Sequence, residues 1–171
     1  MPVRQREEVQ EVPRHLTVGL VAACGLTLLA AQENSDSGVF TAAQAAAGRT
    51  AVESTCGQCH TNSLLGRKGV AGELPPVESL PKSWQDFLKP YGGAVPPLAG
   101  PEFLAKWGGR SIQELAQRLR EGVGGFPPPG MDDATYVNIT AYVLQVNGAK
   151  AGGKALGPAT AGTVTKAVGG R

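Results

Sequence analysis

The sequence predicts an all-α domain. Three segments carry apolar residues at helical spacing, and no segment alternates apolar and polar residues as a half-buried strand does. The aromatic residues, four Phe, two Trp and three Tyr, all lie between Phe40 and Tyr142, which places the folded part there. With 24 glycines and 13 prolines among 171 residues, such a domain has a small core, which excludes a large enzyme domain. Small cores often depend on a disulfide, a metal or a cofactor.

The three main helices are predicted from their caps. Thr41 with Gln44, and Ser111 with Glu114, have the spacing of a capping box. One of the two aspartates at 132–133 caps the third helix. Glycines follow the second and third helices as stop signals. Including their caps, the helices are expected over residues 41–54, 111–122 and 132–147.

Shorter helices are predicted over residues 83–88 and 102–107, and the remaining stretches are loops rich in Pro and Gly. These loops cover residues 74–81, 92–101 and 122–130. Long structureless loops are uncommon in a small domain unless they serve a function. Wrapping a cofactor would give these loops such a function.

Residues 1–31 are predicted to be a signal peptide or an N-terminal anchor. The apolar run Leu16–Ala31 has 16 residues and no charge, fewer than the roughly 20 of a membrane-spanning helix. It follows Arg14 and ends in small residues, as a signal peptide does. A retained anchor is one alternative, and lipidation is another, since the residues around Cys24 resemble a lipobox. All three predict an exported chain that is periplasmic or membrane-anchored.

Residues 149–171 are rich in Ala, Gly and Lys. They carry four basic residues and no acid, whereas residues 32–148, the expected domain, have a net charge of −2. Such a composition buries too little apolar area to offset chain entropy, so we expect a disordered tail. The chain shows no basic stripe or aromatic platform for nucleic acid.

The chemistry is concentrated at residues 56–60, which read Cys-Gly-Gln-Cys-His. This is C-x-x-C-H, the attachment motif of a c-type haem. Positions three and four apart share a helix face. The thiols of Cys56 and Cys59 can therefore reach both vinyl groups along one porphyrin edge and form thioethers, and the His60 imidazole can bind the iron. The motif predicts one covalently bound haem c.

Other interpretations of the motif fit less well. A zinc site needs four ligands, and the only other cysteine and histidine, Cys24 and His15, lie in the export segment. A thioredoxin-like pair follows a strand in a βαβ unit, whereas an Ala-rich helix precedes this motif. A disulfide between Cys56 and Cys59 would close a very small loop and stabilise little.

Residues 39–149 resemble a small exported bacterial class I c-type cytochrome with one haem. Gly48 and Val52 lie eight and four residues before Cys56, where this family places a glycine and an apolar residue. Tyr142 matches the aromatic residue of the family's last helix, which crosses the first helix at the glycine. The resemblance implies a cytochrome c-like fold, with three main helices, short helices and loops around the haem.

The stretch Pro96–Gly100 resembles the family's loop after the attachment helix. The resemblance implies that the Pro96 carbonyl accepts a hydrogen bond from the free ring nitrogen of His60, which would orient the imidazole and raise its donor strength. It also implies that Leu98 packs on the histidine side of the haem. Trp107 would lie near a haem propionate, or alternatively in the core.

The sixth iron ligand departs from the family pattern. The family uses Met, and Met131 is the only methionine besides Met1. An ungapped alignment of the last helix nevertheless places Val123, or Phe126 with a shifted loop, at the ligand position. We favour Met131 in a rearranged loop. A five-coordinate iron is an alternative, as is ligation by a lysine or Tyr91, and Met131 would then be a core residue.

Residues 61–93 resemble an insertion. Trp84, Phe87 and Tyr91 are spaced three and four apart, so they form one aromatic face on a short helix. We expect this face to pack over a haem edge or in a satellite core. The alternative is a docking surface for a partner.

The motif predicts an electron carrier, and not an enzyme, that passes one electron between redox partners. Such partners are a dehydrogenase or quinol-oxidising complex as donor and a terminal oxidase as acceptor. A haem-based small-ligand binder with an open sixth position is the alternative, and the haem subunit of a dehydrogenase or oxidase complex is a third interpretation. Without haem, we expect no compact fold.

Overall fold

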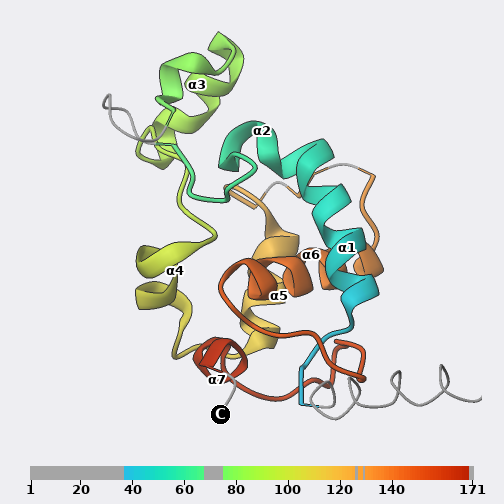
Figure 1. Ribbon diagram of the computed structural model, residues 1–171. Helices are drawn as coiled ribbons and strands as arrows, with labels where there is room; N and C mark the ends of the chain where they lie inside the picture. Colours follow the sequence, from blue (N-terminus) through green and yellow to red (C-terminus); the bar gives the residue numbers. More distant parts are fainter. Residues whose placement is uncertain (1–36, 68–74, 126, 129, 170–171) are drawn as a thin grey trace, which may run out of the picture. The chain divides into compact units, whose positions relative to one another are not determined.

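The computed structural model describes residues 37–67, 75–125, 127–128 and 130–169. The described chain is helical, as predicted, and its only β-type pairings are isolated bridges between Arg67 and Val95 and between Ser111 and Thr163. Residues 1–31, which are predicted to be a signal peptide or an anchor and include Cys24, lie outside the described residues. The α-helices, seen in Figure 1, are α1 Ala42–Ala51, α2 Gly57–His60, α3 Lys82–Leu88, α4 Gly100–Trp107, α5 Ile112–Glu121, α6 Asp133–Val146 and α7 Val164–Gly169.

The predicted caps are confirmed. Thr41 and Gln44 form a reciprocal capping box at the start of α1, and Ser111 and Glu114 form another at α5. Asp132 is the cap of α6, where its carboxylate accepts a hydrogen bond of 2.8 Å from the backbone of Thr135. These side chains satisfy amide groups that a helix start leaves unpaired.

The first helix differs from its prediction in its last turns. Its α-helical part ends at Ala51, and Val52–Cys56 (η1) forms a π-helical segment. The Gly57 amide donates to the carbonyl of Val52, which is the wider hydrogen bond of a π-turn. The segment α2 follows directly, so a continuous helical stretch leads from Thr41 into the C-x-x-C-H residues.

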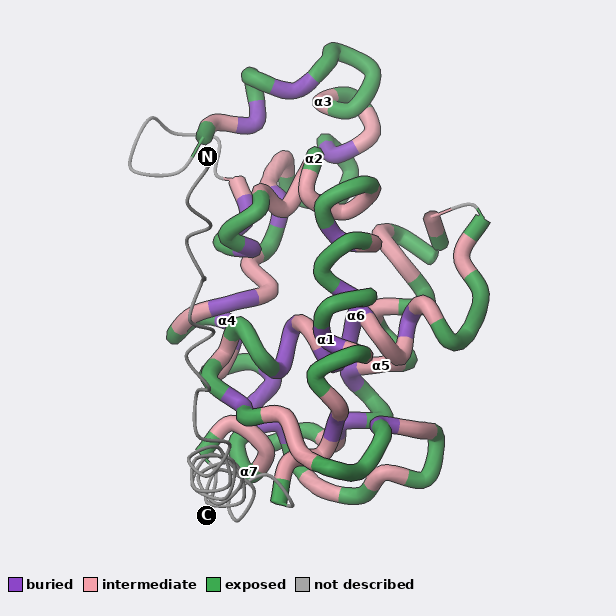
Figure 2. Tube along the Cα trace, turned by 45° about the vertical axis from the view of Figure 1, so that its right-hand side comes forward, coloured by how far each residue is buried: buried purple, intermediate pink, exposed green. Residues whose placement is uncertain are grey.

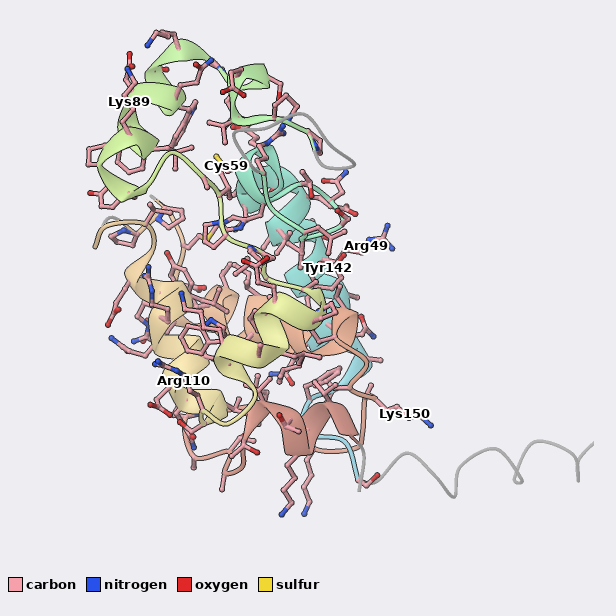
Figure 3. The ribbon with its side chains drawn as sticks, turned by 90° about the vertical axis from the view of Figure 1, so that its left-hand side faces the viewer. Arg49, Cys59, Lys89, Arg110, Tyr142 and Lys150 are labelled. Atoms are coloured by element: carbon pink, nitrogen blue, oxygen red, sulfur yellow. The ribbon has the colours of Figure 1, made fainter. Side chains whose placement is uncertain are left out.

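Helices α1 and α6 lie against each other (Figure 1). They meet at Gly48, where an added Cβ would lie 1.9 Å from the carbonyl oxygen of Asn138. The two backbones can approach this closely only without a side chain at position 48. Arg49 and Tyr142 lie next to each other at the same crossing (Figure 3). The hydrogen bond to Glu53 raises the pKa of Arg49, and Tyr142 adds a smaller effect in the same direction. The predicted glycine crossing is therefore present.

Two apolar clusters fill the described chain. The larger lies around α1, α5 and α6 and includes Phe40, Val52, Leu64 and Phe103, each almost fully buried. The smaller belongs to the segment around α3, and Figure 2 shows its buried positions as separate purple stretches there. Its members are Val77, Leu80, Leu88 and Val95. Such a satellite core was one of the two expectations for the inserted stretch.

The prediction of a disordered C-terminal tail is wrong for residues 149–169. The Gly152 amide donates a hydrogen bond of 2.7 Å to the carbonyl of Phe40. The Gln44 side chain exchanges two hydrogen bonds, of 2.9 Å and 2.8 Å, with the backbone of Leu156. Leu156 and Val164 are buried. Backbone pairing and these two apolar residues hold the segment, although its overall composition is poor in apolar side chains.

Within the described ranges, no helix is long and apolar enough to cross a membrane.

Candidate functional site

The two cysteines of the motif face different apolar clusters. Cys56 ends the π-helical segment and packs against the larger cluster, whereas Cys59, in α2, packs against the smaller one. Both thiols are free and partly buried. Burial raises the pKa of both thiols, and for Cys59 the nearby Arg67 opposes this shift. Both side chains are therefore thiols at neutral pH, placed at the junction of the two clusters.

His60 is held by one hydrogen bond. Its Nδ1 lies 2.9 Å from the carbonyl oxygen of Pro96. A carbonyl can only accept, so Nδ1 carries the proton and Nε2 keeps the lone pair of the neutral ring. Burial lowers the pKa of His60, and the bond to Pro96 only partly opposes this. The contact between His60 and Pro96 that the family resemblance implies is present, and it leaves Nε2 able to bind a metal.

A tight turn after His60 brings the Pro96 loop into place. Thr61 and Leu64 have positive φ angles of 65° and 60°, which non-glycine residues seldom adopt. Gly66 has φ of 78°, and a Cβ there would lie 2.2 Å from the carbonyl oxygen of Val95. This close approach places the chain after Val95, and so the Pro96 carbonyl, beside His60.

Further hydrogen bonds fix the same loop from both sides. The Leu98 amide donates a bond of 2.7 Å to the carbonyl of Leu64. Asn147, at the end of α6, donates to the carbonyl of Leu98 and accepts from the amide of Gly100, each at 3.0 Å. Asn147 was not predicted as a site residue. Its position beside the helix-ending glycine gave no sign that its side chain turns toward the Pro96 loop.

Sequence reasoning also missed Arg67. Its guanidinium donates to the carbonyls of Cys59 and Gln58, at 3.0 Å and 2.9 Å, and to the hydroxyl of Ser79 at 2.7 Å. Its backbone pairs with that of Val95. Arg67 belongs to no motif, and only a three-dimensional structure reveals that its side chain returns to α2.

A cavity of about 180 Å³ opens beside Cys59 and His60. Its remaining walls come from α3 and the turn after it, from the Pro96 loop, from α5 and from the loop after α5. They are Trp84, Phe87, Leu88, Tyr91, Ala94, Val95, Pro96, Arg118, Val123 and Gly124. The expected aromatic face therefore covers this cavity, with Trp84 and Phe87 edge to face at 5.8 Å and Phe87 and Tyr91 at 5.6 Å between ring centroids.

Of the predicted site residues, only Cys59, His60 and Pro96 line this cavity. Cys56, Leu98 and the residues of the helix crossing do not, and neither do Met131 and Trp107. Met131 is partly buried against the larger cluster, and Val123 and Gly124 are the residues of its loop that line the cavity. Trp107 is buried in the larger cluster, beside Phe103 and under the guanidinium of Arg110 at 4.9 Å. Both positions match the core alternatives given for these residues.

The remaining predicted residues are placed near the site in different ways. Leu98 is partly buried against the larger cluster, next to the loop that holds His60. Val52 is fully buried and begins the π-helical segment that carries Cys56. Tyr142 packs on the larger cluster at the α1–α6 crossing. Tyr91, one of the alternative ligands, packs closely against the loop after α5. A Cβ added to Gly124 in that loop would lie 2.1 Å from the Tyr91 hydroxyl oxygen.

The donor set fits a covalently held haem. Two free thiols three residues apart and an imidazole with its Nε2 directed away from Pro96 are the groups that such attachment requires. Across the described ranges, no group of three or more Cys, His, Asp or Glu side chains converges as a metal site of its own. The cavity is smaller than the roughly 300–1,000 Å³ of typical ligand pockets. A porphyrin therefore requires the surrounding Pro/Gly loops to move outward.

Comparisons of the chain with protein-family models, with curated proteins and with solved structures find no match. The functional assignment therefore depends on the residues of this chain and on their geometry.

Proposed function

We propose that this chain is an electron-transfer protein that carries one covalently attached haem c, in the manner of a class I c-type cytochrome. The observation that carries the proposal is the pairing of His60 Nδ1 with the Pro96 carbonyl, directly after two free cysteines in C-x-x-C spacing. The bond fixes the tautomer that an iron ligand requires, because the second ring nitrogen then keeps its lone pair.

Each residue has a definite task in this proposal. Cys56 and Cys59 would hold the group through thioethers, and His60 would supply a nitrogen ligand to its iron. The Pro96 carbonyl fixes the tautomer and the direction of the His60 imidazole, and Leu98 belongs to the same loop as Pro96. When bound, the haem supplies the one-electron chemistry, while the protein sets its ligands, burial and access. The aromatic side chains of Trp84, Phe87 and Tyr91 line the cavity beside His60.

Met131 is the proposed sixth ligand. It is the only thioether in residues 37–169, and it lies in a glycine-rich loop beside the cap of α6. Its side chain packs against the larger cluster, as does that of Cys56. Ligation requires the loop over 122–131 to rearrange, and its four glycines can adopt backbone angles that other residues rarely adopt.

A small-ligand binder or sensor is the second candidate. The observation that favours it is the apolar lining beside His60, where Val123 and Gly124 offer no donor. An iron without a sixth protein ligand would leave this side open to a diatomic gas. The two functions differ in the spin state of the iron and in the rate of carbon monoxide binding.

The proposed partners are redox proteins, such as a dehydrogenase or quinol-oxidising complex and a terminal oxidase. The proposed location is outside the cytoplasm, in the periplasm, with the N-terminus able to hold the chain at a membrane.

The test is expression of the full chain together with a c-type haem-attachment system. We expect covalent haem on the denatured chain by mass spectrometry, and a low-spin spectrum that changes reversibly on reduction. The double variant Cys56→Ser/Cys59→Ser is the control and should carry no covalent haem. Absence of covalent haem from the unaltered chain contradicts the proposal, whereas a high-spin iron that binds carbon monoxide at once supports the binder.

A further inference from the structure

Arg67 closes the carboxyl end of the attachment helix. Its Nε and one terminal nitrogen donate to the carbonyls of Cys59 and Gln58, at 3.0 Å and 2.9 Å. The last carbonyls of a helix have no partner within the helix, and a positive charge at that end is favourable. The guanidinium therefore binds the main chain of α2 directly next to His60.

The same side chain connects three segments of the site. Its other terminal nitrogen donates to the hydroxyl of Ser79, before α3, at 2.7 Å. Its backbone exchanges hydrogen bonds of 3.0 Å and 2.9 Å with Val95, the residue before Pro96. Arg67 thus links the attachment helix, the α3 segment and the loop that holds His60, and a shift of any one of them disturbs the others.

The charge of Arg67 is not balanced at these contacts. Its three acceptors among the described residues are two carbonyls and one hydroxyl, all neutral. The charge nevertheless lies at this site, because the guanidinium nitrogens are 3.0 Å and 2.9 Å from the carbonyl oxygens of Cys59 and Gln58, directly before His60. A fixed positive charge disfavours additional positive charge nearby.

We propose that Arg67 is the positioning residue of this site, which fixes the end of the attachment helix and raises the reduction potential of the group held there. The inference rests on the proposed function. The oxidised form of a haem held by Cys59 and His60 would carry one more positive charge than the reduced form, so the nearby guanidinium would favour the reduced form. The two roles depend on different properties of the side chain, its planar set of donors and its charge.

Two substitutions separate these roles in the haem-loaded full chain. Arg67→Lys keeps the charge, but a single ammonium cannot reproduce the paired geometry of the guanidinium. Arg67→Gln removes the charge as well. Lys150→Gln is the matched control for loss of one charge, because Lys150 is exposed and lies well away from Cys59 in space (Figure 3).

The readouts are the midpoint potential by spectroelectrochemistry and the thermal unfolding midpoint. We expect both Arg67 variants to unfold at a lower temperature than the unaltered chain. The potential should fall for Arg67→Gln, stay near the original value for Arg67→Lys, and be unchanged for Lys150→Gln.

A potential of Arg67→Gln equal to that of the unaltered chain, or equal to that of Lys150→Gln, overturns the electrostatic role. An unchanged unfolding midpoint in Arg67→Lys overturns the positioning role. These results differ from failure of the proposed function, in which the unaltered chain itself carries no covalent haem. In that case the electrostatic role fails with it, and the unfolding midpoints of the variants still decide the positioning role.

Discussion

The Nδ1 atom of His60 donates a hydrogen bond of 2.9 Å to the carbonyl oxygen of Pro96, across 36 residues of chain. Two local features make the contact possible. The turn after His60 reverses the chain through two non-glycine residues with positive φ, and Gly66 then lets the backbone pass close to Val95. The orientation of the imidazole therefore depends on a glycine that belongs to no motif.

Substitution of Gly66 by Ala should displace the Pro96 loop. The new Cβ would lie 2.2 Å from the carbonyl oxygen of Val95, at a backbone φ of 78°. Left-handed backbone costs an alanine about 1–2 kcal/mol, and the overlap adds about 1–3 kcal/mol. We expect a loss of unfolding free energy in urea titrations, together with a lower yield of haem-loaded protein.

Gly92→Ala is the matched control for this substitution. Gly92 has φ of 91°, but a Cβ there meets no atom within 4 Å. Gly92→Ala should therefore lower the unfolding free energy only by the cost of left-handed backbone in an alanine, about 1–2 kcal/mol. Equal effects of the two substitutions would show that the close approach at Gly66 does not matter.

Substitution of Gly48 by Ala should separate α1 from α6. The added methyl group would overlap the carbonyl group of Asn138, which belongs to backbone and cannot rotate away. Overpacking of this kind costs about 1–3 kcal/mol or more. Chemical denaturation is the measurement, and Gly109→Ala, where a Cβ meets nothing within 4 Å, is the control. A Gly48→Ala chain as stable as the control contradicts the crossing.

The parts of the fold that could be predicted follow from local chemistry. Capping boxes need only a hydroxyl and a carboxamide or carboxylate at fixed spacing, so Thr41 and Ser111 marked their helices. The spacing of Trp84, Phe87 and Tyr91 predicted one aromatic face, and these residues line the cavity together, although Tyr91 lies in the turn after α3. The family resemblance predicted that two helices cross at Gly48. In the structure α1 and α6 meet there, and the close approach to Asn138 leaves no space for a side chain.

The missed parts depend on backbone groups that side-chain composition does not reveal. The C-terminal segment is ordered because Phe40 and Gln44 offer it hydrogen bonds from a part of the chain more than 100 residues earlier. The π-turn that ends in Cys56 is one widened hydrogen bond without a sequence signal. Arg67 reaches two main-chain carbonyls, and a carbonyl acceptor has no signature in a sequence.

The ordered C-terminal segment predicts that Leu156→Ala destabilises the protein. Leu156 is buried, and its backbone is held at both polar groups by Gln44. A buried Leu→Ala change costs about 2–5 kcal/mol. Lys154→Ala, at an exposed position of the same segment, should have almost no effect. If thermal unfolding does not distinguish the two variants, the segment does not contribute to the fold.

The ion pairs of α3 predict a pH dependence with a definite sign. Lys82 and Lys89 lower the pKa of Asp86 to about 2, mainly through hydrogen bonds from their ammonium groups. A carboxyl whose pKa is lower in the folded state stabilises that state above its ordinary pKa of 3.8, and the contribution is lost as the pH falls toward 2. The groups are fully exposed, so salt screens the effect.

Comparison of the unaltered chain with Asp86→Asn tests this dependence. At low salt, their thermal unfolding midpoints should differ at pH 6 and converge as the pH falls through about 2, where Asp86 gains a proton and becomes neutral like the asparagine. A difference that is constant over this range, or that grows as the pH falls, would contradict the assigned cause.

Met131 provides the last prediction, because its side chain has two possible tasks that substitution can separate. It packs against the larger cluster, so Met131→Ala should lower stability whether or not the sulfur binds iron. Met131→Leu keeps most of the packing volume and removes only the thioether. In the haem-loaded protein we therefore expect Met131→Leu to abolish the weak sulfur-to-iron band near the red end of the spectrum, with little loss of stability.

Tyr91→Phe is the companion variant, since Tyr91 lines the cavity beside His60 and has a hydroxyl that could bind iron instead. Its spectrum should match that of the unaltered chain. A changed spectrum in Tyr91→Phe with an unchanged one in Met131→Leu would assign the sixth position to the phenol oxygen. If both variants and the unaltered chain are high-spin and bind carbon monoxide at once, Val123 and Gly124 face an open sixth position, and the binder replaces the electron carrier as the function.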